Sequence, residues 1–305
     1  MAAVVLGGTG GIGLAIARSL VERGYAVGIA SRRAGAVRDA AAQLRDAAAK
    51  AWEGRPEGAT AAHALLQSGM APPPVLGIAA EASSKQEVRR VVAETMQAAA
   101  AYAEEAVPAL QGTQWGGVPC SQMLPLRAAV GCSGMPADGL SMRQSEEEAR
   151  LGIDSSLMAG LWLTQEAAIA MRRTGGGSVV LVGSAAHLRP RPGQTAYAAA
   201  KAGLEGLARS AACELGRFGV RVNVCAPGFI GAGMTLSSLS EAEQLAMAQR
   251  SPLRRLGTPA DVAAAVEFLA SPHDAPLLVR DAGPGASFIT GQSLVVDGGL
   301  STSGL

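Results

Sequence analysis

Short apolar runs alternate with longer amphipathic segments along most of the chain. The runs are rich in Val and Ile and predict buried strands at residues 2–8, 25–33, 74–80, 126–134, 177–185 and 220–228. Apolar positions at helical spacing predict helices at residues 11–24, 34–52, 84–107, 146–173 and 197–219. Strands that are apolar throughout are typical of parallel sheets, because helices cover both faces. We therefore predict an α/β fold with a single doubly wound parallel sheet of the Rossmann type and helices on both faces.

Three segments interrupt this alternation, at about residues 46–73, 107–124 and 273–286. Structureless loops longer than about 12–15 residues are uncommon inside a compact domain. We interpret the three segments as surface insertions that lengthen helices or loops. The alternative is that they form a docking surface for a partner subunit. The whole chain, residues 1–305, is predicted to be one domain that carries these insertions.

The composition is that of a protein folded in water, with 49% hydrophobic and 17% charged residues. The net charge of +1 gives no electrostatic case for nucleic acid as a partner. The four cysteines form no C-x-x-C pair and the three histidines lie far apart, so we expect neither a disulfide framework nor a metal site. Proline and glycine interrupt the two uncharged stretches at 58–80 and 106–126, so no membrane span is expected. The first residues, "MAAVVLGG", already have the pattern of a buried strand without a charged leader, so no cleavable presequence is expected.

A glycine-rich turn, within "VVLGGTGGIGLAIA", joins the first predicted strand to the first predicted helix. Glycine permits a tight turn and a close approach of a pyrophosphate, and the N–H groups at a helix N-terminus attract phosphate. The turn predicts a dinucleotide-binding site; the alternative is a glycine turn that only packs. The predicted contacts in this turn are Gly7, Thr9, Gly10, Gly11, Ile12 and Gly13.

A second motif lies in "GSAAHLRPRPGQTAYAAAK", at residues 183–201. Tyr197 and Lys201 are one helical turn apart, so their side chains share a face of the predicted helix. A free tyrosine holds its proton up to about pH 10, and a nearby lysine charge favours the phenolate. Together with Ser184, these groups can hold a carbonyl oxygen and supply a proton to it.

These motifs resemble those of the short-chain dehydrogenase/reductase family. The glycine spacing G-x-x-x-G-x-G and the spacing S-x12-Y-x3-K are both present, and further matches lie at residues 220–230, 252–271 and 288–299. Within the family the sequence is similar to the 3-oxoacyl-[acyl-carrier-protein] reductases, and among these to the mitochondrial carbonyl reductases. The resemblance covers the chain outside the three insertions and implies NAD(P)H-dependent reduction of a carbonyl group.

The resemblance also implies a role for each reactive side chain. Tyr197 is expected to be the general acid, Ser184 to orient the substrate oxygen, and Lys201 to tune Tyr197 and hold the nicotinamide ribose. Ser156 aligns with a helix asparagine that holds a proton-relay water in the family, and the neighbouring Ser155 is an alternative. The implied catalytic residues are therefore Ser184, Tyr197, Lys201 and Ser156.

The residues after the second predicted strand indicate which nicotinamide cofactor binds. Arg32 and Arg33 occupy the place where NAD-selective members of the family carry an acid, and arginine pairs well with a 2′-phosphate. NADPH is therefore expected, and the alternative is that both arginines belong to a solvated loop. The resemblance places Glu81 beside the adenine. The other expected cofactor contacts are Ala82, Cys132, Ser133, Gly134, Tyr197, Lys201, Pro227, Gly228 and Ile230.

Two functional hypotheses stay open, because Gly131 and Ala232 also depart from the family pattern. In the first, the chain reduces a 3-oxoacyl-[acyl-carrier-protein], or a related thioester or quinone, in fatty acid synthesis. The resemblance then implies a homotetramer, or a heterotetramer with a related subunit, in the mitochondrial matrix, with the cytoplasm as the alternative. In the second, the chain is a weakly active or inactive structural subunit of a mixed assembly.

Basic side chains near the reactive motif suggest two places for substrate contact. His187, Arg189 and Arg191 lie between Ser184 and Tyr197 and either touch the substrate or belong to an exposed loop. Arg172, Arg173 and Arg217 either steer an acidic carrier protein or only complement the ends of helices.

Overall fold

The computed structural model describes residues 1–54, 69–110, 124–135, 139–233, 240–271 and 285–302. Seven strands form one sheet in the order β3-β2-β1-β4-β5-β6-β7, and every neighbouring pair is parallel. The predicted parallel sheet is confirmed. The strands are β1 (Ala2–Leu6), β2 (Ala26–Ser31), β3 (Val75–Ala79), β4 (Leu126–Gly131), β5 (Gly177–Val182), β6 (Val220–Pro227) and β7 (Ser293–Val296).

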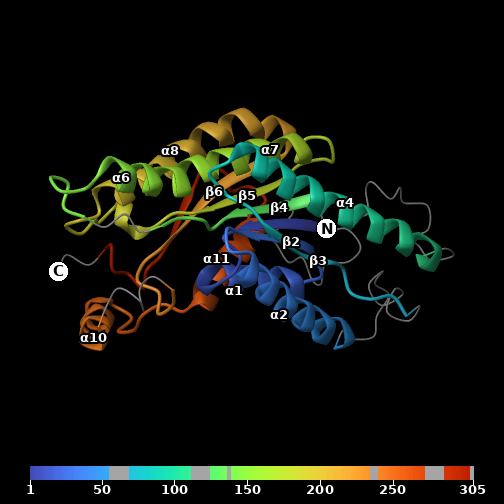
Figure 1. Cartoon of the computed structure of the whole chain (residues 1–305), viewed down its shortest axis with the longest axis horizontal. Coiled ribbons are helices and arrows are strands. Elements are labelled where there is room, and N and C mark those ends of the chain that lie inside the picture. The colour runs from blue at the N-terminus through green and yellow to red at the C-terminus, as the bar shows by residue number, and fades with distance from the viewer. Residues whose placement is uncertain (55–68, 111–123, 136–138, 234–239, 272–284, 303–305) are drawn as a thin grey trace.

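Helices cover both faces of this sheet, as predicted (Figure 1). On one face lie α4 (Lys85–Leu110), α7 (Ala159–Met171) and α8 (Thr195–Leu215), and on the other lie α1 (Gly11–Glu22), α2 (Ala34–Glu53) and α11 (Pro259–Ala270). Two shorter helices, α6 (Glu146–Ile153) and α10 (Glu241–Arg250), lie at the same end of the molecule in Figure 1. The short 3-10 turns are η2 (Ala185–His187) and η3 (Gly216–Phe218).

Alternation within each strand explains why the strands are apolar throughout. Val4 packs into the core on the α4, α7 and α8 face, whereas the next residue, Val5, packs into the core on the α1, α2 and α11 face. Val179 and Val180 divide in the same way in β5. Successive side chains of a strand point to opposite faces, so a sheet covered on both sides needs an apolar residue at every position.

The predicted helix at residues 146–173 is interrupted, which corrects the sequence prediction. Between α6 and α7 the structure has a π-helical turn, η1, at Asp154–Met158. Such turns break the regular hydrogen-bond ladder inside a helix and occur frequently at functional sites. Ser155 and Ser156 lie in this turn and are buried. The Ser155 hydroxyl accepts a hydrogen bond from the Met135 N–H at 3.1 Å, which ties the turn to the segment after β4.

The three predicted insertions fall largely on residues 55–68, 111–123 and 272–284, outside the described residues. The described flanks of the first are held by neighbouring helices. The Trp52 indole N–H donates to the Met70 carbonyl at 3.0 Å, and the Tyr102 hydroxyl donates to the Ala71 carbonyl at 2.8 Å. Among the described helices, none is both long enough and apolar enough to cross a membrane.

Candidate active site

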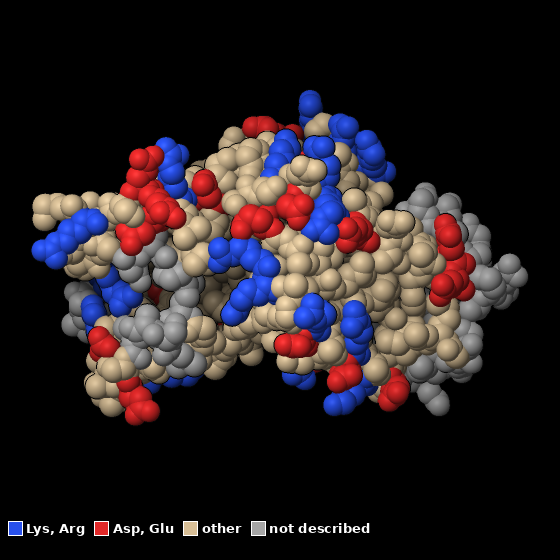
Figure 2. Space-filling model, viewed as in Figure 1, with Lys and Arg blue, Asp and Glu red and all other residues tan. Residues whose placement is uncertain are grey.

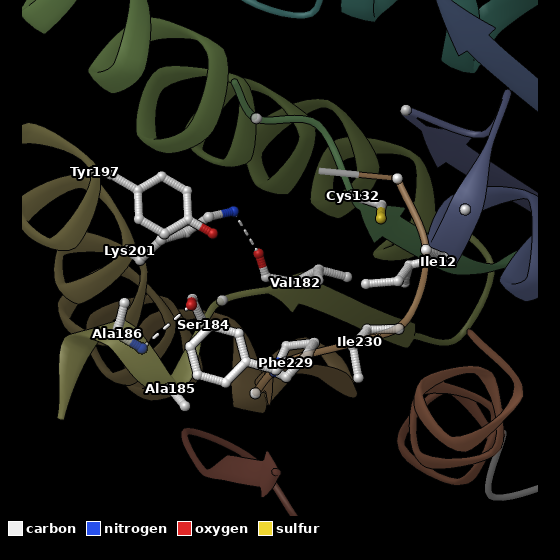
Figure 3. Close-up of a pocket in the computed structure, with 18 of the residues that line it drawn as sticks. Ile12, Cys132, Val182, Ser184, Ala185, Ala186, Tyr197, Lys201, Phe229 and Ile230 are labelled. Carbon is white, nitrogen blue, oxygen red and sulfur yellow. Dashed lines mark hydrogen bonds between the residues drawn. The ribbon is translucent and has the colours of Figure 1, made fainter. Parts of the chain in front are cut away.

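A pocket of about 410 Å³ opens at the carboxyl ends of the strands, beside the point where the strand order reverses between β1 and β4. Doubly wound sheets bind ligands at this switch point. The pocket collects residues that follow β1, β4, β5, β6 and β7 in the sequence, and Figure 3 shows the side chains of several of them. The predicted site residues that line it are Gly7, Gly10, Gly11, Ile12, Gly13, Cys132, Ser133, Gly134, Ser184, Tyr197, Lys201, Pro227, Gly228 and Ile230.

The glycine turn leads into the N-terminus of α1 at the wall of the pocket. Gly10 caps α1 with an extended backbone and without a side-chain hydrogen bond, and the first turn of α1 contains no acid. A Cβ on Gly13 would overlap the Gly7 carbonyl oxygen, whereas a Cβ on Gly10 would meet nothing within 4 Å. Gly13 therefore allows α1 to pack closely against the Gly7 backbone, and the absence of a side chain at Gly10 leaves the space in front of the helix open. This space, in front of an uncapped helix N-terminus, fits the pyrophosphate of a dinucleotide.

The three reactive side chains predicted from the sequence converge on this pocket (Figure 3). The buried Lys201 Nζ donates to the Val182 carbonyl at 2.8 Å and lies 5.7 Å from the centre of the Tyr197 ring. Ser184 Oγ accepts the Ala186 N–H at 3.2 Å, which leaves the hydroxyl proton of Ser184 available to a ligand. A carbonyl oxygen in the pocket can thus meet two hydroxyl groups, with a lysine charge behind one of them.

Ser156 lies behind Lys201 and does not line the pocket. A Cβ on Gly134 would lie 2.8 Å from Ser156 Oγ and 3.2 Å from Lys201 Nζ, so glycine at this position lets the two polar groups approach. Ser156 Oγ is buried, and it has no hydrogen-bond partner among the described residues. Buried hydroxyl groups are normally satisfied, so this hydroxyl is available as a partner for a small polar molecule such as water. Ser155, by contrast, already has the Met135 N–H as a partner.

Cys132 contributes a neutral thiol to the pocket. Burial raises the pKa of this thiol to about 11, although the charge of Lys201 acts in the opposite direction. Since a thiolate, and not a thiol, is the nucleophile, Cys132 lines the pocket at neutral pH without being reactive. Gly131 and Gly134, on either side of this segment, allow other side chains to pack closely against the end of β4. A Cβ on Gly131 would lie 3.1 Å from the Leu181 side chain.

The arginine predicted to select the cofactor lies at the end of β2, beyond the residues that line the pocket. Arg32 Nε is 3.9 Å from a carboxylate oxygen of Glu81, and Arg32 Nη2 is 2.7 Å from the Met135 sulfur. About half of the Arg32 side chain is exposed. Arg33 is exposed and caps α2. The structure therefore brings Arg32 and Glu81 together. The predicted residues outside the pocket lining are Thr9, Arg32, Arg33, Glu81, Ala82 and Ser156.

Several pocket residues were not singled out from the sequence. Phe229 is one of them, and the Arg191 guanidinium lies over its ring at 5.1 Å. Arg189 and Arg191 line the pocket, and Arg189 donates to the Leu300 carbonyl at 3.4 Å. The described lining includes these two arginines and Lys201 but neither Asp nor Glu. The lining residues without an earlier assignment are Val182, Gly183, Ala185, Ala186, Gln194, Phe229, Gly233, Leu300 and Ser301.

Two of the arginines suggested as contacts for a carrier protein, Arg172 and Arg173, lie away from the pocket. Arg172 caps the C-terminus of α7, and Arg173 follows it, shortly before β5 begins at Gly177. The pocket lies at the opposite, carboxyl end of β5, where Ser184 follows the strand. Within one chain, therefore, the positive charge nearest the mouth comes from Arg189 and Arg191 rather than from Arg172 and Arg173.

Comparisons with known proteins agree with this geometry. The profile described as "short chain dehydrogenase" matches residues 1–68, and the profile described as "Enoyl-(Acyl carrier protein) reductase" matches residues 121–301, more than half of the chain. A dinucleotide-type cradle and a Ser-Tyr-Lys cluster on a doubly wound sheet are what such a class of protein requires. The chain belongs to the short-chain dehydrogenase/reductase family.

Curated relatives narrow the resemblance. The chain is 38% identical over 168 residues to the 3-oxoacyl-[acyl-carrier-protein] reductase FabG of Rickettsia typhi, a match that covers 55% of this chain and 64% of the relative. It is 38% identical over 176 residues to the 3-oxoacyl-[acyl-carrier-protein] reductase MabA of Mycobacterium tuberculosis, covering 58% and 66%. The FabG of Chlamydia muridarum is 39% identical over 172 residues, covering 56% and 64%. The chain thus spans less than two thirds of the length of each relative.

Proposed function

We propose that this protein is an NADPH-dependent reductase that converts a 3-oxoacyl thioester to the 3-hydroxyacyl product, with the acyl group carried on acyl carrier protein in fatty acid synthesis. The observation that carries the proposal is the convergence of Ser184, Tyr197 and Lys201 on a pocket whose opposite wall is the glycine cradle. The printed names of the bacterial relatives support the same reaction class.

Each reactive residue has a defined task in this proposal. NADPH, when bound, supplies the hydride. The Tyr197 hydroxyl donates its proton to the substrate oxygen, and the Ser184 hydroxyl donates a hydrogen bond to the same oxygen. Lys201, held by the Val182 carbonyl at 2.8 Å, keeps a positive charge beside Tyr197, which stabilises the phenolate left after proton transfer. Ser156, with its unpaired hydroxyl, is proposed to hold the water that returns a proton to this cluster.

The direct test is oxidation of NADPH by the purified protein with an acetoacetyl thioester, followed by the loss of absorbance at the nicotinamide band and by identification of the 3-hydroxybutyryl product. Turnover supports the reductase. Binding of NADPH without turnover on thioesters, quinones and small ketones contradicts it and favours the alternative, a structural subunit of a mixed assembly.

Cofactor choice provides a separate prediction. Replacing Arg32 by alanine is expected to weaken NADPH binding by about 10- to 100-fold, the strength of a hydrogen bond to a charged group, while NADH binding changes little. Arg33→Ala tests the neighbouring guanidinium in the same way. Titration of cofactor fluorescence measures both affinities, and Arg38→Ala, on the exposed face of α2, is the matched control. Equal losses for NADPH and NADH would contradict a 2′-phosphate contact.

The mouth arginines predict a preference for substrates that carry an anionic arm. With Arg191→Gln, KM for acetoacetyl-coenzyme A is expected to rise roughly 10-fold, because one charge-assisted contact is lost. KM for the uncharged N-acetylcysteamine thioester should stay the same. The double charge reversal Arg172→Glu with Arg173→Glu, at the other end of β5, is expected to leave both values unchanged. A parallel rise of KM for both thioesters in Arg191→Gln would show that charge is not what this residue recognises.

Two further parts of the proposal concern the surroundings of the protein. We propose a tetramer, formed by this chain alone or with a related subunit, and a location in the mitochondrial matrix. An exposed sheet edge supports the first part: β7 pairs with β6 on one side, and the side chains of Phe288 and Leu294 near this edge are exposed. Sedimentation equilibrium and fractionation of cells test the two parts independently.

A further inference from the structure

His187 is neither an exposed loop residue nor part of the pocket lining. It ends the 3-10 turn η2 that Ser184 caps, and only 12% of its side chain is exposed. His187 Nδ1 lies 2.6 Å from the backbone carbonyl oxygen of Ser184. Because a carbonyl oxygen can only accept a hydrogen bond, Nδ1 must carry a proton. The imidazole therefore holds the backbone of Ser184 through a hydrogen bond from Nδ1 to the carbonyl oxygen.

The other ring nitrogen of His187 faces a buried acid. His187 Nε2 lies 3.8 Å from Glu205 Oε1, and 8% of the Glu205 side chain is exposed. Glu205 lies one helical turn after Lys201 in α8. Its Oε1 also accepts a hydrogen bond from the Ser293 hydroxyl of β7 at 2.9 Å. The acid is thus held by the sheet on one side and faces the imidazole on the other.

Attraction between the imidazole and the carboxyl group depends on which of their atoms carry protons. With Nδ1 protonated, a neutral imidazole would point the lone pair of Nε2 at a carboxylate, and two acceptors repel each other. Attraction requires either an imidazolium facing a carboxylate or a neutral imidazole facing a protonated acid. Ser293 donates to Glu205 Oε1 at 2.9 Å, and a Cβ on Gly183 would lie 3.6 Å from that oxygen. The titratable Lys201 precedes Glu205 by one turn of α8, and its Nζ donates to the Val182 carbonyl.

We propose that His187 is a positioning residue for Ser184 and that Glu205 orients it. This inference deepens the proposed function, because it rests on Ser184 holding the substrate oxygen. Ser184 is fixed twice: its hydroxyl oxygen by the Ala186 N–H at 3.2 Å, and its carbonyl by His187 at 2.6 Å. An acid that fixes the tautomer and the angle of a histidine, which then acts on a further group, is an arrangement that active sites use repeatedly. Here the further group is the backbone of a hydroxyl-bearing residue.

Two substitutions separate the two contacts of the imidazole. The amide nitrogen of asparagine occupies the place of Nδ1, so His187→Asn keeps the donor to the Ser184 carbonyl and loses the contact with Glu205. The amide nitrogen of glutamine reaches the place of Nε2, so His187→Gln keeps the Glu205 contact and loses the donor. We expect kcat on an acetoacetyl thioester to fall about 10-fold in His187→Gln, the worth of roughly one hydrogen bond, and by less in His187→Asn. NADPH affinity should be unchanged in both.

A double-mutant cycle tests whether His187 acts through Ser184. In a Ser184→Ala background, His187→Gln is expected to lower kcat by less than about 2-fold, because residues that act in series are not additive. Glu205→Gln should resemble His187→Asn. The matched control is Glu214→Gln: Glu214 is exposed on the same helix and also accepts a serine hydroxyl, from Ser210 at 3.3 Å. It should leave kcat unchanged. Equal losses with and without the Ser184 hydroxyl would overturn the proposal.

A spectroscopic readout keeps this test apart from the test of the proposed function. The chain has three histidines, so the ring nitrogens of His187 can be assigned in a ¹⁵N–¹H spectrum as the signals that disappear in His187→Asn. A protonated, hydrogen-bonded Nδ1 supports the proposal whether or not thioesters are turned over. An Nδ1 that lacks its proton overturns it, even in a protein with full activity. Absence of turnover in the wild type, by contrast, counts against the reductase itself.

Discussion

Replacing Tyr197 by phenylalanine is expected to lower kcat on an acetoacetyl thioester by about 10²- to 10⁴-fold, the usual contribution of a general acid. The substitution removes one hydroxyl group and keeps the ring, whose centre lies 5.7 Å from Lys201 Nζ. The pocket shape and the glycine cradle on its opposite wall stay as they are, so NADPH affinity should fall by no more than about 10-fold, the worth of the one hydrogen bond that the Tyr197 hydroxyl is expected to give the cofactor. Stopped-flow oxidation of NADPH measures the rate, and cofactor fluorescence measures the affinity.

A second tyrosine provides the control for this loss. Tyr102 on α4 donates its hydroxyl hydrogen to the Ala71 carbonyl at 2.8 Å, away from the pocket. Tyr102→Phe removes the same atom and one hydrogen bond, so we expect a loss of about 1 kcal/mol of stability and no loss of kcat. If Tyr197→Phe kept more than about a tenth of the wild-type rate, the proton would come from another group, and Tyr197 would have only a binding role.

Replacing Gly13 by alanine is expected to damage both the fold and the binding of the cofactor. The added Cβ would overlap the Gly7 carbonyl oxygen, a backbone atom that cannot rotate away. Helix α1 would have to move from the end of β1, and its uncapped N-terminus would leave the mouth of the pocket. Overpacking of this kind costs about 1–3 kcal/mol, which thermal unfolding detects. NADPH binding should fall by at least about 10-fold, since each 1.4 kcal/mol is a factor of ten.

Substitution of Gly10 distinguishes an effect on helix packing from an effect on NADPH binding. Gly10 also lines the pocket, but a Cβ there would meet nothing within 4 Å, and its backbone is extended with φ of −170°. Gly10→Ala should therefore leave the free energy of unfolding unchanged and weaken only NADPH binding. Unchanged NADPH affinity in Gly10→Ala would mean that the pyrophosphate lies elsewhere.

The sheet was predictable because its information is local. Each strand has to be apolar on two faces, as Val4 and Val5 show, so a short apolar run already identifies a buried parallel strand. The π turn at Asp154–Met158 was not predictable in this way. Asp154, Ser155 and Ser156 are weak helix formers, but this composition does not distinguish a π turn from an α-helix. The feature that holds the turn, the bond from the Met135 N–H to Ser155, joins segments that are distant in the sequence.

The residues of the candidate site also differ in how far they could be predicted from the sequence. Ser184, Tyr197 and Lys201 were found because their spacing follows one loop and one helix, which sequence distance reports faithfully. Arg32 and Glu81 were assigned separately, and only the parallel pairing of β2 with β3 brings their side chains within 3.9 Å. Leu300 belongs to a segment after β7 and enters the lining through the fold alone. A site residue that belongs to no motif and lies far in the sequence from the other site residues cannot be identified from a single sequence.

The hydrogen bond from Lys201 Nζ to the Val182 carbonyl connects α8 directly to the end of β5. Ser184 lies at one end of the segment that this bond closes, and Tyr197 and Lys201 lie at the other end. Arg189 and Arg191, at the mouth of the pocket, belong to the loop between them. The first residues of that loop, Ala186 and His187, contact Ser184, whereas Arg189 and Arg191 follow them and line the pocket. Substitutions at the two arginines can therefore change the charge at the mouth of the pocket while the contacts that hold Ser184 and Lys201 stay in place.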